Sequence, residues 1–430
     1  MSPLQIGLAL FAGMLALMAL RAPIAVSMFV PGAIGYLAMA GEPALLNYLK
    51  GLAWARLSVY DLSVIPLFLL MGQFATQGGL SRALFAFANA LIGHLRGGMA
   101  MAAVLACAAF GTVCGSSVAT AATVTQVALP EMRRHNYTGR LATGTLAAGG
   151  TLGILIPPSV ALILYGFAFN VSIGDLFLAG VLPGLMIAAI FAIYVAIRHR
   201  RVAQAPDIPV EAAGSRLRAI GSLLPLIVLI VVVFGAIYRG FATPTEAAVI
   251  GVVGAMVLAL IDRTLSFGVI VESLKATVLF CAAIGLILGA SAALQVAMAY
   301  TGIPRTIVTW IEGVNLGYYG LLLVIAVILI VLGCFMDGLS MIVLTGSVLL
   351  PVAQSAGFDL LWFGVFMVIL VEIGLITPPI GFNLFVLQRI SGWQLPQLAA
   401  AAFPFLLLML LSLVIITIFP SIVTILPRLL

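Results

Sequence analysis

Charged residues are scarce in this 430-residue chain. They make up 7% of it, hydrophobic residues make up 64%, and the mean hydropathy is +1.29. A soluble domain keeps roughly a quarter of its residues charged, so the composition excludes an ordinary water-soluble protein. Lipid is therefore the main solvent of the chain. At about 20 apolar residues per span, the length has room for about a dozen membrane elements.

Lysine is nearly absent: the chain has 2 Lys beside 17 Arg, and its net charge is +6. Most of the arginines lie in short loops between apolar runs, which is the pattern of cytoplasmic loops in membrane proteins. No basic stripe carries interleaved aromatic residues, so the positive charge predicts a bilayer as partner and no nucleic acid.

Cysteine and histidine are too few and too scattered for a reactive site. The four cysteines lie in apolar stretches without a CxxC pair, and the three histidines lie beside arginine in polar loops. These residues are Cys107, Cys114, Cys281, Cys334, His94, His135 and His199. Metal and disulfide spacings are missing, as are a nucleophile–base set and a phosphate-binding glycine loop. The sequence predicts a protein that is not an enzyme.

One long polar segment, residues 198–218, lies near the midpoint of the chain. Its five arginines predict a cytoplasmic linker between two halves, residues 1–197 and 219–430. Counting outward from the linker predicts an all-α polytopic protein with about ten full spans. These spans lie at about 4–20, 23–40, 60–78, 141–168, 176–197, 220–238, 245–261, 272–300, 360–388 and 398–424.

A re-entrant hairpin is predicted in each half. Residues 98–130 are flanked by Arg96 and Arg133, so both ends are cytoplasmic, and Gly115-Ser116-Ser117 is the tip of the hairpin. Residues 317–350 have acidic flanks and form the counterpart that faces outward. Each tip is expected to reach partway into the bilayer.

An internal repeat is the strongest signal in the sequence. Pro130 is followed 23 residues later by Gly153, which opens Gly-Ile-Leu-Ile-Pro-Pro, and Pro351 is followed 23 residues later by Gly374, which opens Gly-Leu-Ile-Thr-Pro-Pro. The offset between the copies is 221 residues. Because each half has five spans, an odd number, the second copy is upside down, and the repeat is inverted.

The repeated G-x-x-x-P-P element predicts a broken membrane helix. Each proline removes a backbone N–H and clashes with the carbonyl four residues back, which leaves carbonyls without partners. Such a break is tolerated only beside protein or a water-filled cavity. Free carbonyls suit a cation, and the N–H groups of the following half-helix suit an anion. Two copies beside two hairpins favour a transport site over simple helix kinks.

Several side chains near the tips can carry chemistry. The first tip supplies hydroxyls, and Thr151 adds another in the broken helix. Asp337 follows Gly333 in the second tip, and Glu372 stands at the repeat position of Thr151. A carboxylate at membrane depth costs several kcal/mol unless it is paired. Asp337 is predicted to structure a second cation site and Glu372 is a weaker candidate; the alternative for both is a structural hydrogen bond.

The combined motifs resemble the large membrane subunit of tripartite ATP-independent periplasmic (TRAP) transporters. They are Gly115-Ser-Ser-Val-Ala-Thr, Thr151-Leu-Gly-Ile-Leu-Ile-Pro-Pro-Ser, Thr243-Pro-Thr-Glu-Ala-Ala and Glu372-Ile-Gly-Leu-Ile-Thr-Pro-Pro-Ile-Gly. The resemblance covers essentially the whole chain.

This resemblance implies sodium-coupled import of a small organic acid across the bacterial inner membrane, with two or more sodium ions as coupling ions. A domain holding both hairpins would move like an elevator against a fixed scaffold. A periplasmic binding protein would deliver the substrate, and a small four-span subunit from a separate chain would complete the scaffold. The alternative is a single-component carrier of the same superfamily that needs no binding protein; a channel has no support in the sequence.

The resemblance also implies site residues. The first sodium site would draw on Gly115, Ser116, Ser117, Thr151 and Gly153. The second would draw on Gly333, Asp337, Gly374 and Thr377. Substrate would lie between the tips, near Ser116, Ser117, Pro157, Pro158, Gly338, Pro378 and Pro379.

Overall fold

The computed structural model describes residues 3–20, 22–77, 80–202, 213–302, 317–334, 338–378 and 381–429. Within these ranges every regular element is helical, and no strand occurs. The predicted all-α class is therefore confirmed. Between the second and third predicted spans, residues Glu42–Leu57 form a further helix of 16 residues.

The helices of the first half are α1 (Pro3–Ala19), α2 (Ile24–Ala40), α3 (Glu42–Leu57), the 3₁₀ helix η1 (Tyr60–Ser63), α4 (Val64–Gln77), α5 (Leu80–Ile92), α6 (Gly98–Cys114), α7 (Ser117–Arg134), α8 (Gly139–Leu155), α9 (Val160–Phe169) and α10 (Ile173–Val202). Those of the second half are α11 (Ala213–Tyr238), α12 (Pro244–Ile261), α13 (Phe267–Thr301), α15 (Tyr318–Gly333), α16 (Gly338–Ser355), α17 (Leu360–Leu375), α18 (Phe382–Ser391), α19 (Leu395–Ile418) and α20 (Ser421–Leu429).

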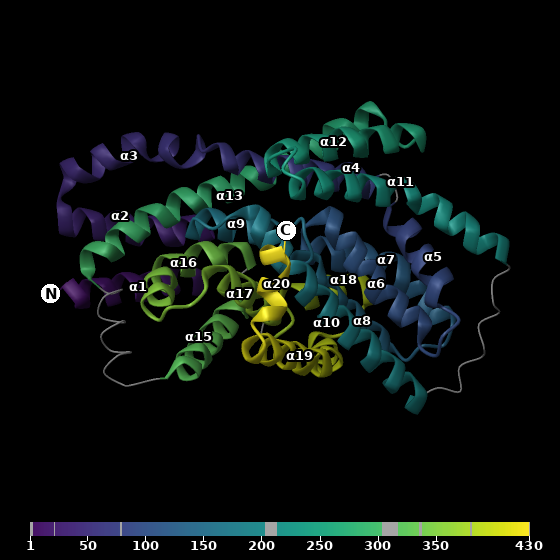
Figure 1. The fold of residues 1–430 in the computed structure, drawn as a ribbon. Helices are drawn as coiled ribbons and strands as arrows, with labels where there is room; N and C mark the ends of the chain where they lie inside the picture. The colour runs from purple at the N-terminus through teal and green to yellow at the C-terminus, as the bar shows by residue number, and fades with distance from the viewer. Residues whose placement is uncertain are drawn as a thin grey trace.

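The helices form two groups in space (Figure 1). An outer group of α2, α3, α4, α11, α12 and α13 runs along the top of the view, and a core group of α6 to α10 and α15 to α20 packs below it. Contacts agree with this division, because α13 packs against α2 and α4, and α12 packs against α4. In the core group, α8 packs against α6, α7 and α19, and α17 packs against α15 and α16.

The core group repeats one succession of helix lengths. Helices α6, α7, α8 and α9 have 17, 18, 17 and 10 residues. Helices α15, α16, α17 and α18 have 16, 18, 16 and 10 residues. A long helix follows each set, α10 with 30 residues and α19 with 24. The repeat in the sequence therefore folds as a helical hairpin, a two-part helix and a long helix, twice over.

Four described helices are long and apolar enough to cross a membrane, and two bent pairs bring the number to six. The four are Ile173–Arg198, Pro244–Ile261, Phe267–Thr301 and Leu395–Ile418. The other apolar helices in the described part of the chain have 10–17 residues. At 1.5 Å per residue, 17 residues span about 26 Å, slightly less than the hydrocarbon core of about 30 Å. Several of the ten predicted spans are thus short.

Two predicted boundaries differ from the structure. The predicted linker, residues 198–218, is partly helical, because α10 runs on to Val202 and α11 begins at Ala213. The last predicted span, residues 398–424, stops at Ile418, and α20 follows as a separate helix. Pro420 has no N–H to continue α19, which explains the second difference.

The first parts of the two broken helices form the centre of the core. Every residue from 141 to 155 in α8 and from 362 to 375 in α17 is buried. A helix that is buried on all sides must be covered by protein all round. Helices α8 and α17, which lead into the two breaks, therefore lie inside the core group and away from lipid.

Candidate functional site

The first hairpin turns within two residues. Helix α6 ends at Cys114, Gly115 has a φ of 60°, and α7 begins at Ser117. This left-handed backbone is one that glycine adopts freely. Ser116 caps α7, because its Oγ accepts a hydrogen bond from the backbone N–H of Ala119 at 3.4 Å. The predicted Gly-Ser-Ser tip is therefore a tight turn with a capped second helix.

The first broken helix breaks at the predicted proline pair. Residues 156–159 separate α8 from α9, and the two helices are bent by 44°. Pro157 and Pro158 have no N–H, so the carbonyls of Gly153 and Ile154 have no helical donor four residues on. Two carbonyl oxygens are thus left free for other partners at the break.

The first hairpin contacts the first broken helix through a pair of glycines. A Cβ on Gly111 would lie 2.4 Å from the Cα of Gly153, so the two backbones are in direct contact. A Cβ on Gly153 would lie 2.4 Å from Thr120 Oγ1 and 3.1 Å from the carbonyl oxygen of Ser116. The Thr120 hydroxyl is buried and has no hydrogen-bond partner among the described residues. Backbone and hydroxyl oxygens therefore gather beside Gly153.

The second half repeats this glycine contact. A Cβ on Gly374 would lie 2.6 Å from the Cα of Gly333 and 3.2 Å from its carbonyl oxygen. Three residues later, the Thr377 hydroxyl donates to the carbonyl of Ile373 at 2.5 Å. The end of α15 therefore meets the end of α17 as α6 meets α8. Asp337 and Pro379, the other predicted residues here, lie outside the described residues.

A buried hydrogen-bond network joins the two halves. The Ser117 hydroxyl donates to Glu372 Oε2 at 2.9 Å and accepts from Asn383 Nδ2 at 2.7 Å. All three side chains have an exposed fraction of 0%. The first tip is thus tied to α17 and to α18, on both sides of the second helix break. The structural alternative considered for Glu372, a hydrogen bond to a hairpin, is present.

Glu372 is unusual in its burial. It is the only buried Asp, Glu, Lys, Arg or His side chain in the part of the chain whose side chains are described. Its Oε1 and the Oδ1 of Asn383 have no hydrogen-bond partner there. No cluster of three or more His, Cys, Asp and Glu occurs among the described residues. The oxygens at the two breaks are therefore mostly carbonyls and hydroxyls, which suit a hard cation of low charge.

Three other predicted site residues, Thr151, Pro157 and Pro158, have neighbours outside the glycine contacts. The Thr151 hydroxyl donates to the Ala148 carbonyl at 2.6 Å and lies 3.8 Å from Met409 Sδ, so it faces α19. Pro157 lies toward α10, since a Cβ on Gly180 would be 3.6 Å from its Cδ. Pro158 instead borders a small apolar void between the tip, α4 and α11. The two prolines thus have different neighbours.

The two described residues of the second predicted substrate region differ in burial, because Gly338 is buried and Pro378 is not. Gly338 packs on α17, because a Cβ there would lie 2.4 Å from the side chain of Val371. Pro378 is exposed. The structure therefore brings the predicted Gly333 and Gly374 together in the second half. In the first half it places Gly153 beside the carbonyl of Ser116 and Gly115 beside that of Pro158, and it leaves Thr151 and Pro157 outside these contacts.

Three residues of the site escaped the prediction. Gly111 and Thr120 contact Gly153, and Asn383 contacts Ser117. Gly111 carried a usable signal, because it lies 42 residues before Gly153 and Gly333 lies 41 before Gly374. Asn383 carried none, since the residue it binds is 266 positions away.

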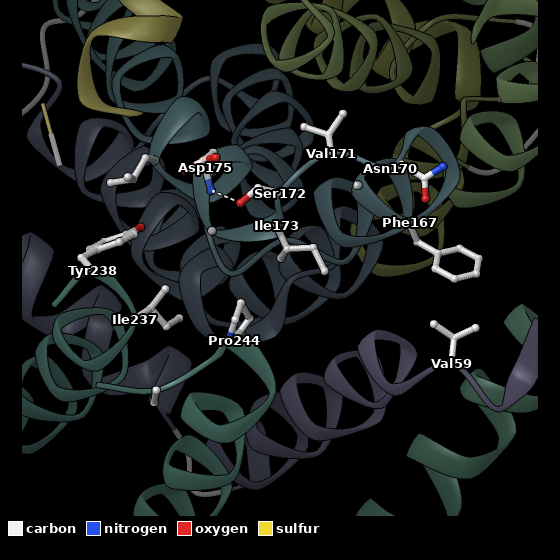
Figure 2. Close-up of a pocket in the computed structure, with 14 residues that line it drawn as sticks. Val59, Phe167, Asn170, Val171, Ser172, Ile173, Asp175, Ile237, Tyr238 and Pro244 are labelled. Atoms are coloured by element: carbon white, nitrogen blue, oxygen red, sulfur yellow. Dashed lines mark hydrogen bonds between the residues drawn. The ribbon is translucent and has the colours of Figure 1, made fainter. Parts of the chain in front are cut away.

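A cavity lies apart from these contacts (Figure 2). It has a volume of about 630 Å³ and is bordered by the loop from α9 to α10 and by the ends of α11 and the start of α12. In the loop, the Asp175 N–H donates to Ser172 Oγ at 3.3 Å. Tyr238 and Pro244 line the opposite side. The cavity therefore separates part of the core group from part of the outer group.

Comparisons with known proteins agree with these features. A family model described as "Tripartite ATP-independent periplasmic transporter, DctM component" matches residues 11–422. The C4-dicarboxylate TRAP transporter large permease protein DctM of Pseudomonas aeruginosa is 39% identical over 378 residues, which cover 86% of each chain. The sialic acid TRAP transporter large permease protein SiaM of Vibrio cholerae is 30% identical over 373 residues, covering 86% of this chain and 87% of that one.

A solved structure is also similar. It is the Alcanivorax borkumensis YdaH transporter, with a TM-score of 0.64 and 14% sequence identity, covering 89% of this chain and 90% of that chain. At this identity the likeness concerns the fold alone. The helices of the chain thus share their arrangement with those of a known transporter.

Proposed function

Because the chain belongs to the DctM components of tripartite ATP-independent periplasmic transporters, we propose that it couples the import of a small organic acid to sodium. The chain is the large permease of a secondary transporter in the bacterial inner membrane, and it is not an enzyme. Family membership implies two partners, a small membrane subunit and a periplasmic binding protein. In the proposal, the binding protein delivers the substrate and the small subunit is a separate four-span chain.

One observation carries the proposal: the same glycine contact between a hairpin and a broken helix occurs in both halves. Gly111 meets Gly153 in the first half, and Gly333 meets Gly374 in the second. Each contact lies next to a helix break, where carbonyls lose their donors. We assign one sodium ion to each break, because unwound carbonyls and hydroxyls are typical sodium ligands in transporters.

The first sodium site is proposed to use the carbonyl of Ser116, the hydroxyl of Thr120 and the free carbonyl of Gly153, with Gly115 and Ser117 shaping the tip. The second is proposed to use the backbone of Gly333, Gly374 and Thr377, and Asp337, which lies outside the described residues, stays a predicted member of this site. Thr120 and Gly153 in the first site and Gly333 and Gly374 in the second are buried. In the proposal, the sodium ion replaces the hydrogen-bond donors that their oxygens lack. Substrate is proposed to lie between the two tips, and each sodium ion is proposed to stabilise the tip on one side of it.

An elevator motion is part of the proposal. The two tips and both broken helices belong to the core group, and the Ser117–Glu372–Asn383 network ties the halves of that group together. The cavity of about 630 Å³ lies at the boundary with α11 and α12 of the outer group. A core group that moves as one body past the outer group would carry ions and substrate together.

The substrate class rests on the relatives. The two named above transport, by their names, C4-dicarboxylates and sialic acid. Both are organic acids, so we infer a small carboxylate as substrate. The choice of acid is expected to depend on the binding protein, because the tips present mostly backbone.

Uptake into proteoliposomes tests the proposal. Vesicles containing the chain and its small subunit are supplied with the binding protein and a labelled C4-dicarboxylate or sialic acid. Accumulation is expected only with an inward sodium gradient and with the binding protein present. Accumulation with a potassium gradient of equal size would refute sodium coupling. Accumulation without the binding protein would support the single-component carrier instead.

A further inference from the structure

Three core-group helices end together around a basic cavity on the predicted cytoplasmic side. The cavity has a volume of about 270 Å³. Its walls are the start of α8, the end of α10 and the start of α19. The lining residues that carry the argument are Thr138, Arg140, Tyr194, Arg198, Pro404 and Phe405.

Two arginines give the cavity its charge. Arg140 lies in the first turn of α8 and Arg198 near the end of α10, and both are exposed. The one ion pair among the described residues joins Arg134 and Glu131, so neither cavity arginine is neutralised by a carboxylate in that part of the chain. Two guanidinium groups without a carboxylate partner favour an anion, and a guanidinium fits a phosphate by two parallel hydrogen bonds.

The start of α8 adds to the preference for an anion. Thr138 is the N-cap, and its hydroxyl accepts from the N–H of Leu141 at 3.4 Å. The first N–H groups of a helix have no partner within the helix, and the positive end of the helix dipole lies there. Arg140 therefore stands in a turn that already attracts negative charge.

The outer surface beside the cavity is apolar. On α10, Ile193 and Ile197 have exposed fractions of 60% and 51%. On α19, Phe403 and Leu407 have exposed fractions of 56% and 50%. In a membrane-spanning chain such side chains face lipid tails. Arg198 directly follows the second isoleucine, so the cavity lies where the lipid-facing surface gives way to charge.

Aromatic packing closes the apolar side of the cavity. The ring of Tyr194 packs edge-on against Phe405 with the ring centroids 5.1 Å apart. Below the cavity, α8 and α19 touch closely, since a Cβ on Gly144 would lie 2.3 Å from the carbonyl oxygen of Ala401. The cavity is thus bounded on its apolar side by the Tyr194–Phe405 pair and by the contact of α8 with α19.

We propose that this cavity binds the phosphate headgroup of an anionic phospholipid from the inner leaflet, with Arg140 and Arg198 as its ligands. Basic pockets between membrane helices on the cytoplasmic side bind such headgroups. The exposed stripes of α10 and α19 take the acyl chains, which a soluble anion does not have. The lipid holds the cytoplasmic ends of α8, α10 and α19 together.

Lipid binding to the purified chain in complex with its small subunit tests this assignment. Retained lipid is measured by native mass spectrometry after titration with dioleoylphosphatidylglycerol or dioleoylphosphatidylcholine, which have the same acyl chains. The phosphatidylglycerol is expected to bind more tightly. The double variant Arg140→Gln/Arg198→Gln is expected to bind it about tenfold more weakly or worse, because it loses two charge-assisted contacts. Phosphatidylcholine binding by the variant serves as the check that it is folded.

Arg263→Gln is the matched control, because Arg263 is an exposed arginine after α12 and does not line the cavity. It is expected to bind phosphatidylglycerol as the unaltered chain does. Equal retention of the two lipids, or equal loss in the control and the double variant, overturns the proposal. Displacement of phosphatidylglycerol by millimolar inorganic phosphate would assign the cavity to a soluble anion and would also overturn it.

Discussion

Replacing Ser117 with alanine removes the hydroxyl at the centre of the network between the halves. Two hydrogen bonds are lost, at 2.9 Å to Glu372 and at 2.7 Å from Asn383. Both partner groups are fully buried, so each is left without its partner at a cost of about 1–3 kcal/mol. We expect Ser117→Ala to lower the free energy of unfolding by about 2–6 kcal/mol.

The free energy of unfolding is measured by titrating the protein with sodium dodecyl sulfate in mixed micelles and following its helical circular dichroism. Ser412→Ala is the matched control. Ser412 is equally buried, but its hydroxyl donates only to the carbonyl of Leu408 in its own helix, at 2.8 Å. Such backbone contacts contribute little to stability, so the control is expected to lose less than about 1 kcal/mol.

A double-mutant cycle isolates the contact between the halves. Ser117→Ala and Glu372→Ala are expected to be non-additive by about 0.5–3 kcal/mol, as for residues in one network. Glu372→Gln is expected to keep much of the stability, because its amide oxygen still accepts from Ser117. The reasoning is refuted if Ser117→Ala costs no more than Ser412→Ala, or if the two alanine variants are additive within about 0.3 kcal/mol.

Three further outcomes follow from the packing. Gly374→Ala is expected to lose about 1–3 kcal/mol of stability, because its Cβ would lie 2.6 Å from backbone Cα of Gly333. Gly289→Ala, with nothing within 4 Å, is expected to gain about 0.5–1 kcal/mol in the same titration; equal effects would contradict the contact. Thr151→Val is expected to leave the sodium dependence of uptake unchanged, since its hydroxyl faces α19, and a clear loss of sodium activation would disprove this. Thr243→Ala removes the capping box of α12 and is expected to cost about 1 kcal/mol of stability; no change would count against the cap.

The helix breaks are predictable because they depend on local chemistry. Pro157 and Pro158 remove two adjacent donors wherever the helix lies, and α8 ends at Leu155 as the proline pair requires. The Gly115 tip is also local, since a glycine followed by two serines favours a turn and a cap. Because the second half repeats the sequence pattern of the first, the same local fold is predicted for it.

Side-chain directions are less predictable because they depend on the rotation of each helix. Successive residues in a helix point about 100° apart, so Gly150 and Gly153 face α7 while Thr151 between them faces α19. Periodicity does not reveal that rotation in a helix that is apolar on every side. Thr151, next to the predicted site glycine Gly153, was therefore predicted as a ligand although its hydroxyl faces α19.

The link between the halves could not be predicted from local pattern at all. Ser117 and Glu372 are 255 residues apart, and only the packing of α7 against α18 and of α8 against α17 brings them together. Glu372 was predicted as a candidate because burying a carboxylate at membrane depth costs free energy unless the group is paired. This cost did not identify the partner, which is Ser117 in the first hairpin.

Sodium binding at equilibrium tests the paired sites most directly. The number of sodium ions bound per chain is measured with radioactive sodium on the purified complex of the chain and its small subunit, and on Gly153→Ala and Gly374→Ala. We expect two or more ions for the unaltered chain and one fewer for each variant. The added Cβ would lie 2.4 Å from Thr120 Oγ1 in the first proposed site and 2.6 Å from the Cα of Gly333 in the second. Gly289→Ala is expected to bind as many ions as the unaltered chain. Unchanged stoichiometry in both break variants would contradict the assignment of one sodium ion to each helix break.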